Sequence, residues 1–450
     1  MDNTYLSTTL RPCLTALYFV FLLHHLSNTV EGGDSPSPYT PVDNIILNCG
    51  SSGNSTAIDG RTWIGDVNSN FFPPESSQNQ ASLTATAVKQ SSYATRIPYT
   101  TARLSDSAFT YIFPVTPGQK FVRLYFYPAS YGNFVRSKAI FSVKTGPFTL
   151  LSNFIASVIA DADGDPSDTI LREFCVNIEE DERLNLTFTP SDSNSFAFVN
   201  GIEILSMPPN LYYTPSNDEG FPFIGQQNLY RIDNGTALEM EYRINVGGNS
   251  ITPSEDTGMF RSWSPDSMYL TEDRRSPLPV NTTIELQFTK IPAYTAPQNV
   301  YRTARTMGVN KTINKSYNLT WEFSVDSGFD YLVRLHFCEF QPEIIAMHDR
   351  VFLIFIANQT AETAANVIVW AGSNGVPVYK DYAVSMFGKE NQKKMNLSIA
   401  LQANPNDYVT YFTDAILNGI EIFKVSDVSG NLAGPNPEPV CVATSHSLRL

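Results

Sequence analysis

Residues 121–127 read Phe121-Val122-Arg123-Leu124-Tyr125-Phe126-Tyr127, and the alternation within this stretch decides the fold of the chain. Its even-numbered side chains are all apolar, whereas its odd-numbered ones are aromatic apart from Arg123. A period of two residues is typical of a strand whose two faces are covered differently. A closely similar stretch, Val333-Arg334-Leu335-His336-Phe337, follows about 200 residues later. We therefore expect one buried strand in each of two copies of the same domain.

Three further motifs occur twice, in the same order along the chain. The first copies are Asn48-Cys49-Gly50, Thr101-Ala102-Arg103 and Asn200-Gly201-Ile202-Glu203-Ile204, and the second copies are Asn245-Val246-Gly247, Thr303-Ala304-Arg305 and Asn418-Gly419-Ile420-Glu421-Ile422. This period exceeds the repeat unit of a solenoid, so each copy should be a domain with its own core. We expect the first domain at 42–207, a linker rich in Pro, Asn and Gly at 208–225, and the second domain at 226–426. Residues 427–450 lose the pattern and are expected to form an irregular tail.

Short β-rich segments separated by Ser, Gly, Pro and Asn fill both copies, and no long amphipathic helix is predicted between them. The expected strands of the first copy are residues 45–47, 109–113, 121–127, 139–143, 172–176, 184–189 and 197–205. Those of the second copy are residues 242–246, 319–325, 331–337, 350–356, 395–401 and 416–424. Many short strands with turn signals between them predict an all-β fold of two tandem antiparallel β-sandwiches.

The N-terminus has the layout of a secretory signal peptide. Arg11 precedes an apolar run at residues 14–23, and the small residues Gly32 and Gly33 follow. We expect cleavage that removes residues 1–33; an uncleaved anchor helix is the alternative, but the run is short for a hydrocarbon core of roughly 30 Å. Nine N-x-S/T sequons agree with export and predict a glycosylated surface: Asn54, Asn185, Asn234, Asn281, Asn310, Asn314, Asn318, Asn358 and Asn396.

Composition narrows the function classes. A formal net charge of −14 argues against nucleic acid as a partner and suits a basic ligand, with solubility as the equally simple explanation. Outside the signal peptide the histidines are His336, His348 and His446, and none lies at a metal-ligand spacing. The acidic run at 161–165 lacks the spacing of an EF-hand, so a surface turn is favoured over a calcium loop. We expect no metal and no cofactor.

No enzyme motif stands out either. The chain carries no nucleophile elbow, no phosphate-binding loop and no kinase signature set, so a non-enzymatic role is predicted. Four cysteines lie outside the signal peptide, which are too few to scaffold two domains: Cys49, Cys175, Cys338 and Cys441. Their pairing is left open, and Cys338 is expected to be a buried thiol.

Tyrosines are the candidate ligand contacts, because their rings stack on sugar faces and bury area at low entropic cost. The candidates in the first copy are Tyr93, Tyr99, Tyr125, Tyr127 and Tyr131. For Tyr125 and Tyr127 the alternative is packing on the second face of the sheet. Arg123 is expected to form a structural cation and aromatic pair with Tyr125.

Longer stretches resemble a known family. In the first copy these are residues 47–50, 121–128 and 198–203, and in the second copy residues 242–249, 256–258, 331–338, 374–377 and 430–437. They are similar to the tandem malectin-like domains of plant receptor kinases of the FERONIA type. The resemblance covers about residues 42–437, and it implies two jelly-roll-like β-sandwiches at the cell surface. The second copy looks closer to that family than the first, and one of its matching stretches is Tyr331-Leu332-Val333-Arg334-Leu335-His336-Phe337-Cys338.

The resemblance also implies a function. Ectodomains of that family receive basic cysteine-rich peptides of the rapid alkalinisation factor class, often with GPI-anchored co-receptors, and have been linked to cell-wall pectin. Family members continue past residue 437 into a transmembrane helix and a kinase, which we do not find in this sequence. We therefore expect an extracellular recognition module for a basic peptide or wall carbohydrate, secreted or at the outer face of the plasma membrane. A lectin-like protein of the secretory pathway and a carbohydrate-active enzyme are the alternatives.

Overall fold

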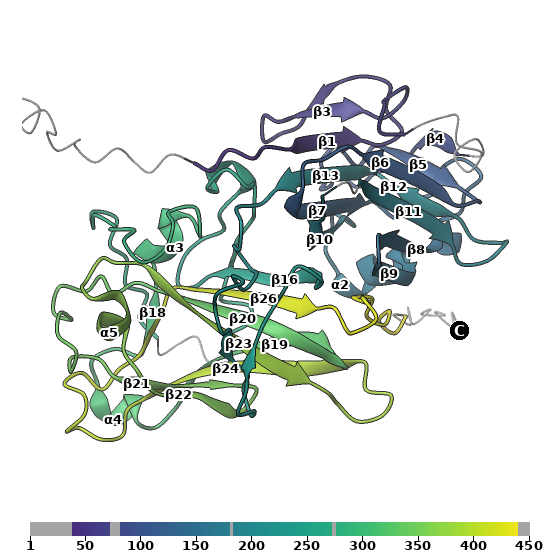
Figure 1. Ribbon diagram of the computed structural model, residues 1–450. Helices are drawn as coiled ribbons and strands as arrows, with labels where there is room; N and C mark the ends of the chain where they lie inside the picture. Colours follow the sequence, from purple (N-terminus) through teal and green to yellow (C-terminus); the bar gives the residue numbers. More distant parts are fainter. Residues whose placement is uncertain (1–37, 73–81, 181–182, 272–275, 440–450) are drawn as a thin grey trace, which may run out of the picture. The chain divides into compact units, whose positions relative to one another are not determined.

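The computed structural model describes residues 38–72, 82–180, 183–271 and 276–439 (Figure 1). The predicted signal peptide, Cys13, Cys441 and His446 lie outside the described residues. The described chain is built mainly of β-strands with a few short helices, which confirms the predicted all-β class. Within these ranges no helix is long and apolar enough to cross a membrane.

The first half folds as two facing sheets. One contains β2 (Ser55–Thr56), β3 (Thr62–Gly65), β1 (Asn44–Asn48), β13 (Gly201–Ser206), β7 (Gly118–Phe126) and β10 (Ile170–Ile178), in that order. The other contains β6 (Phe109–Phe113), β11 (Leu184–Pro190), β8 (Ile140–Thr145) and β9 (Phe148–Ile155). Val122, Leu124 and Phe126 of β7 are fully buried in the core between these sheets. The predicted alternation is confirmed, since Phe121 and Tyr125 belong to separate clusters on the other face.

The second half repeats this arrangement. One sheet contains β16 (Leu238–Asn245), β26 (Gly419–Val425), β20 (Phe329–Phe337) and β23 (Val378–Met386), and the facing sheet contains β19 (Leu319–Asp326), β24 (Lys394–Ala403), β21 (Phe352–Ile356) and β22 (Gln359–Ala365). Val333, Leu335 and Phe337 of β20 are buried in the core between them. β20, which corresponds to β7, therefore also turns every second side chain toward an equivalent core.

Several elements were not predicted. They include β2, β3, β4 (Leu83–Thr86), β5 (Thr101–Ser105), β9, β22 and β23, together with the helices α2 (Ala156–Asp163), α3 (Gln298–Arg302), α4 (Lys311–Asn314) and α5 (Val367–Ala371). The single strand predicted at 197–205 is observed as two, β12 (Ala197–Val199) and β13. β23 has polar residues at its centre, Lys380 and Asp381, because Asp381 pairs there with Arg334 of β20. A buried cross-strand ion pair interrupts the alternation of apolar and polar side chains from which a strand is predicted in a sequence.

The repeated motifs meet one another in each half. Gly50, at φ +80°, lies against the strand that carries Thr101-Ala102-Arg103, and an added Cβ would lie 2.3 Å from the Ala102 carbonyl oxygen. Asn200 donates its side-chain amide to the Thr101 carbonyl at 2.8 Å. In the second half Gly247 lies in the same way against Ala304, and Asn418 donates to the Thr303 carbonyl. The motifs recur because three segments must pack at one junction, where a side chain on the glycine would clash.

The two halves share one sheet. β10 pairs with β16 in antiparallel register, so the first sheet of each half continues into that of the other. The predicted linker at 208–225 is packed rather than free: Tyr212 is 2% exposed and its hydroxyl donates to Glu421 at 2.7 Å. The domain boundaries predicted from sequence remain a proposal, because contacts run continuously across residue 207.

An ionic chain, here called the seam, runs along this junction. Arg123 and Arg243 both bind Glu173, at 2.5 and 2.8 Å, and Arg243 also binds Glu421 at 2.8 Å. All these side chains are nearly inaccessible to solvent. Burial raises the pKa of Glu173, but the two guanidinium groups outweigh this and hold it at about 2. His336 continues the chain, because its Nε2 lies 3.0 Å from Glu421.

The C-terminal segment at 427–438, here called the strap, returns to the first half. It is irregular, as predicted, but Leu432 is fully buried in the core of the first half. The Thr149 N–H donates to the Gly430 carbonyl, and the Thr149 carbonyl accepts from the Leu432 N–H, both at 2.9 Å. The Asn436 side chain donates to the Asn153 carbonyl and accepts from the Ile155 N–H. The strap lies directly after β26 and so ties the second half to the first.

Candidate ligand-binding cavities

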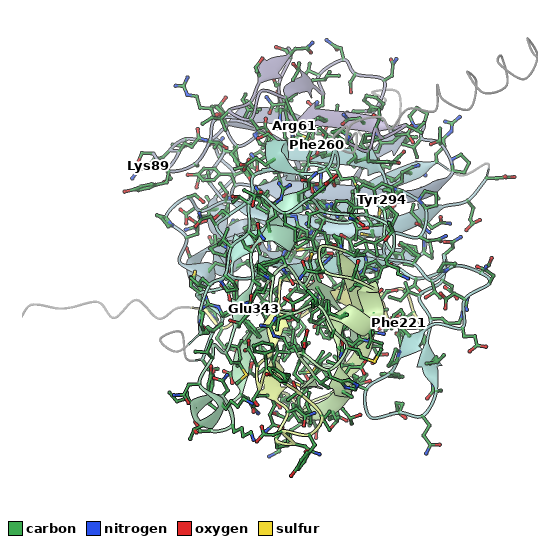
Figure 2. All side chains as sticks on the ribbon, turned by 90° about the vertical axis from the view of Figure 1, so that its left-hand side faces the viewer. Arg61, Lys89, Phe221, Phe260, Tyr294 and Glu343 are labelled. Atoms are coloured by element: carbon green, nitrogen blue, oxygen red, sulfur yellow. The ribbon has the colours of Figure 1, made fainter. Side chains whose placement is uncertain are left out.

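Two of the five predicted tyrosines line one cavity in the first half. Tyr93 is 72% exposed, and the ring of Tyr127 forms part of the same wall. This first-half cavity measures about 740 Å³ and is also lined by Lys89, Arg136 and Asp168. Lys89 projects from the surface in Figure 2. The Tyr127 hydroxyl accepts a hydrogen bond from the Ser91 backbone at 2.8 Å, which fixes the ring.

The other three tyrosines are core residues. The Tyr125 hydroxyl donates to Glu203 at 2.7 Å and the Tyr131 hydroxyl to the Tyr127 carbonyl at 2.8 Å, while Tyr99 packs on Tyr125. All three are at most 9% exposed. Tyr127 is 5% exposed and packs in the same cluster as Tyr99 and Tyr125, so most of its ring is also core and Tyr93 is the one exposed ring of the five. The expectation that Tyr99, Tyr125 and Tyr131 meet a ligand is therefore corrected to a packing role. A strand with two covered faces buries both sets of side chains, which the alternation alone does not reveal.

Arg123 also has different partners from the one predicted. Its guanidinium binds Glu173 and Glu203, and it stacks over the ring of Phe121 with its central carbon 5.0 Å from the ring centroid. Tyr125 reaches the same Glu203 rather than Arg123. The predicted pair is thus a carboxylate-centred cluster.

The sequons divide by accessibility. Seven asparagines are exposed and Asn281 is half-buried, so these eight agree with the predicted glycosylated surface; the exposed ones are Asn54, Asn185, Asn234, Asn310, Asn318, Asn358 and Asn396. Asn314 is fully buried, and its amide nitrogen donates to the carbonyls of Gly308 and Thr413 at 2.7 and 2.8 Å. A glycan on Asn314 would replace one of these two N–H groups and would need space that a fully buried side chain does not have, so the prediction for this residue is corrected.

A second cavity of about 740 Å³ opens at the loop end of the second half. It is lined by residues 277–279, by Thr306, Gly308, Val309 and Lys311 next to α4, and by residues 407 and 410–414. Figure 2 faces this end of the chain, and Glu343 is labelled at the rim of this second-half cavity. Several rim side chains are apolar and exposed: Val309 is 99%, Tyr411 72% and Leu278 52% exposed.

A buried ionic group lies at the floor of the second-half cavity. Arg350 is 4% exposed, and its guanidinium binds Glu339 at 2.6 Å, Gln341 at 2.6 Å and Asp414 at 2.8 Å. Burial raises the pKa values of both Glu339 and Asp414, although Arg350 counteracts this. The Nε of Arg350 is buried and has no acceptor among the described residues. Sequence reasoning missed this group, which only an alignment of the two copies would have suggested.

In the described part of the chain, no group of three or more His, Cys, Asp or Glu side chains could hold a metal ion. Of the acidic run, Asp161 and Asp163 belong to α2, and Asp161 pairs with Arg136 at 2.8 Å. Cys49, Cys175 and Cys338 are buried free thiols, which for Cys338 confirms the prediction.

The model of the malectin-like domain family matches residues 47–425, a range that includes strands of both sandwiches. The chain therefore belongs to the malectin-like family. It is 48% identical over 433 residues to the receptor-like protein kinase FERONIA of Arabidopsis thaliana, which covers 94% of this chain and 46% of that protein. Against the receptor-like protein kinase ANXUR2 of the same plant it is 36% identical over 414 residues, 90% of this chain and 46% of that one. The chain spans about half the length of these relatives.

Solved structures agree with this membership. A crystal structure of the plant receptor-like kinase FER matches at a TM-score of 0.80 and 46% identity, covering 88% of this chain and all of that one. The ANXUR1 extracellular domain from Arabidopsis thaliana matches at 0.79 and 34%. A crystal structure of the plant peptide RALF23 in complex with FER and LLG2 matches at 0.79 and 46%, covering 89% of this chain and all of the matched one.

Proposed function

We propose that this chain is the ligand-perceiving extracellular part of a receptor-like kinase of the FERONIA type. Its ligand is a basic cysteine-rich signalling peptide of the rapid alkalinisation factor class, and it binds together with a GPI-anchored co-receptor. The observation that carries the proposal is the match at 46% identity to FER in a complex with a peptide and LLG2. The net charge of −14 agrees with a basic ligand, since opposite charge speeds encounter.

The location follows from the same proposal. A signal-peptide layout and eight accessible sequons support export and a glycosylated outer surface. In this role the described sandwiches bind ligand and catalyse no reaction.

Titration calorimetry tests the function. The chain, secreted from a glycosylating host, is titrated with a peptide of this class, with and without an LLG-type co-receptor, at two salt concentrations. Saturable binding that is tighter with the co-receptor and weaker at higher salt is expected. No binding in either arm, with a FER ectodomain binding in parallel as the positive control, would contradict the proposal.

Carbohydrate binding at the first-half cavity is the second candidate. One observation favours it: an exposed ring, Tyr93, and a fixed ring, Tyr127, share a cavity with the cations Lys89 and Arg136. Aromatic faces and cations suit an acidic sugar such as demethylated pectin. Titration with such fragments tests it, and Tyr93→Ala should weaken that binding about tenfold. Unchanged affinity in Tyr93→Ala would contradict this assignment.

A further inference from the structure

We propose that the second-half cavity is the docking site for a basic segment of the peptide, with one cationic side chain directed at the floor and an apolar neighbour against the rim. This inference rests on the proposed function and adds where the peptide binds and what recognises it. Three observations support it: the absence of the buried ionic group from the first half, an unused hydrogen-bond donor, and the exposed apolar rim.

The first half serves as an internal control for the ionic group. The β7 and β20 strands align residue by residue, so Pro128 occupies the position of Glu339. Ahead of β8 and β21, Ala139 and Arg350 each form an isolated parallel bridge and occupy equivalent positions. The first half therefore adopts the same fold with Pro128 and Ala139 at the positions of Glu339 and Arg350, and so without this ion pair. Because apolar replacements of buried ion pairs are often neutral or stabilising, folding alone does not explain the group in the second half.

The floor has an unused donor and an excess of negative charge. Arg350 lines the cavity, and the N–H at its Nε has no acceptor among the described residues. A backbone carbonyl of a bound peptide supplies one. Asp407 is paired with Lys315 at 2.9 Å, and Arg350 with Glu339 and Asp414. Together with Lys311 and Glu343 of the lining, this makes three cations against four carboxylates. A cationic side chain of the ligand would balance the excess negative charge. Its attraction to the buried carboxylates is stronger than to carboxylates at the surface, because water screens them less.

The rim supplies the apolar part of the site. Three apolar side chains around one opening are at least half exposed: Val309, Leu278 and Tyr411. Exposed apolar side chains are usually scattered singly over a protein surface, so a group of three marks a contact site. An exposed tyrosine beside aliphatic residues is a frequent anchor in interfaces. Cavities of this size with a few convergent polar groups are the usual ligand sites.

Substitutions at the rim test the proposal without touching the buried group. Tyr411→Ser and Glu343→Gln change exposed side chains, and each should weaken binding of the peptide, in the presence of the co-receptor, by about fivefold to twentyfold. Glu343→Gln should also flatten the salt dependence, because one charge contact is lost.

A substitution within the buried group gives a further test. Asp414→Asn removes one floor carboxylate and should weaken binding of the peptide by a similar factor. Its thermal unfolding is recorded to separate loss of fold from loss of affinity.

Matched controls lie close by. Tyr408→Ser removes a fully exposed ring from the same loop that does not line the cavity, and Glu390→Gln removes an exposed carboxylate elsewhere in the second half. Both should bind the peptide like the unsubstituted chain.

The outcomes separate the two proposals. If the unsubstituted chain binds the peptide but Tyr411→Ser and Glu343→Gln bind equally well, the docking site is wrong while the function stands. If the unsubstituted chain binds no peptide, both proposals fail. If the rim variants instead lose affinity for neutral oligosaccharides and keep it for the peptide, the occupant is a sugar and the inference is overturned.

Discussion

Glu173 is the residue on which the contact between the two halves depends most. It lies on β10, fully enclosed, and both oxygens of its carboxylate are taken by guanidinium groups, one from each half. Removing Glu173 would leave the buried Arg123 and Arg243 with one carboxylate fewer each, and loss of one partner of a buried ion pair typically costs about 3–5 kcal/mol. The seam therefore fixes the register between halves that share a sheet.

Acid should weaken this contact. The pKa of Glu173 is about 2 in the folded chain against an ordinary value of 4.5, so the unfolded state binds the proton more readily. Its stabilisation, about 3 kcal/mol, is fully present above pH 4.5 and is lost as the pH falls toward 2. Denaturant unfolding of the wild type and of Glu173→Gln at pH 7, 4 and 3 measures this. The difference in their unfolding free energies should shrink on acidification; a constant difference would contradict the assignment.

Asn314 gives a second test at the residue scale. Because both amide hydrogens bind backbone carbonyls and the side chain is buried, a chain that carries a glycan at Asn314 could not adopt this fold. Glycopeptide mapping of the secreted protein should find glycans at Asn310 and Asn318 but not at Asn314. Occupancy at Asn314 similar to that of its neighbours would show that the segment around α4 folds differently.

Individual elements show why sequence predicted some parts and missed others. β6 and β19 have uninterrupted apolar alternation, and the predicted and observed bounds agree to within one residue. β23 was missed because Arg334 of another strand accounts for its central Asp381. The same limit applies to the candidate sites: a single loop tyrosine such as Tyr93 can be proposed from sequence, whereas Arg350 and Asp414 are 64 residues apart and only the fold joins them.

The strap allows a prediction at the element scale. Leu432→Ala removes a fully buried side chain from the first-half core and should lower the free energy of unfolding by about 2–5 kcal/mol. Val428→Ala, on the same strap but fully exposed, is the matched control and should change it by less than about 0.5 kcal/mol. Denaturant titrations at neutral pH give both values. Equal effects would mean that the strap is not docked in solution.

For the whole molecule, the internal repeat distinguishes features that both halves share, which the fold requires, from features found in one half only. The junction of the repeated glycine, arginine and asparagine motifs occurs in both halves, so it belongs to the fold. The group around Arg350 occurs in one half only, which is why it is assigned to recognition. Tandem copies in a single sequence thus supply a comparison that usually needs relatives.

Hydrogen exchange of the chain, with and without the peptide and its co-receptor, tests most directly whether the peptide docks at the second-half cavity. Amides of residues 306–311 and 407–414, which border the second-half cavity, should exchange more slowly in the complex, while those at 88–93 of the first-half cavity should not change. Protection confined to the first half, or none at a peptide concentration that saturates a FER ectodomain, would contradict the account.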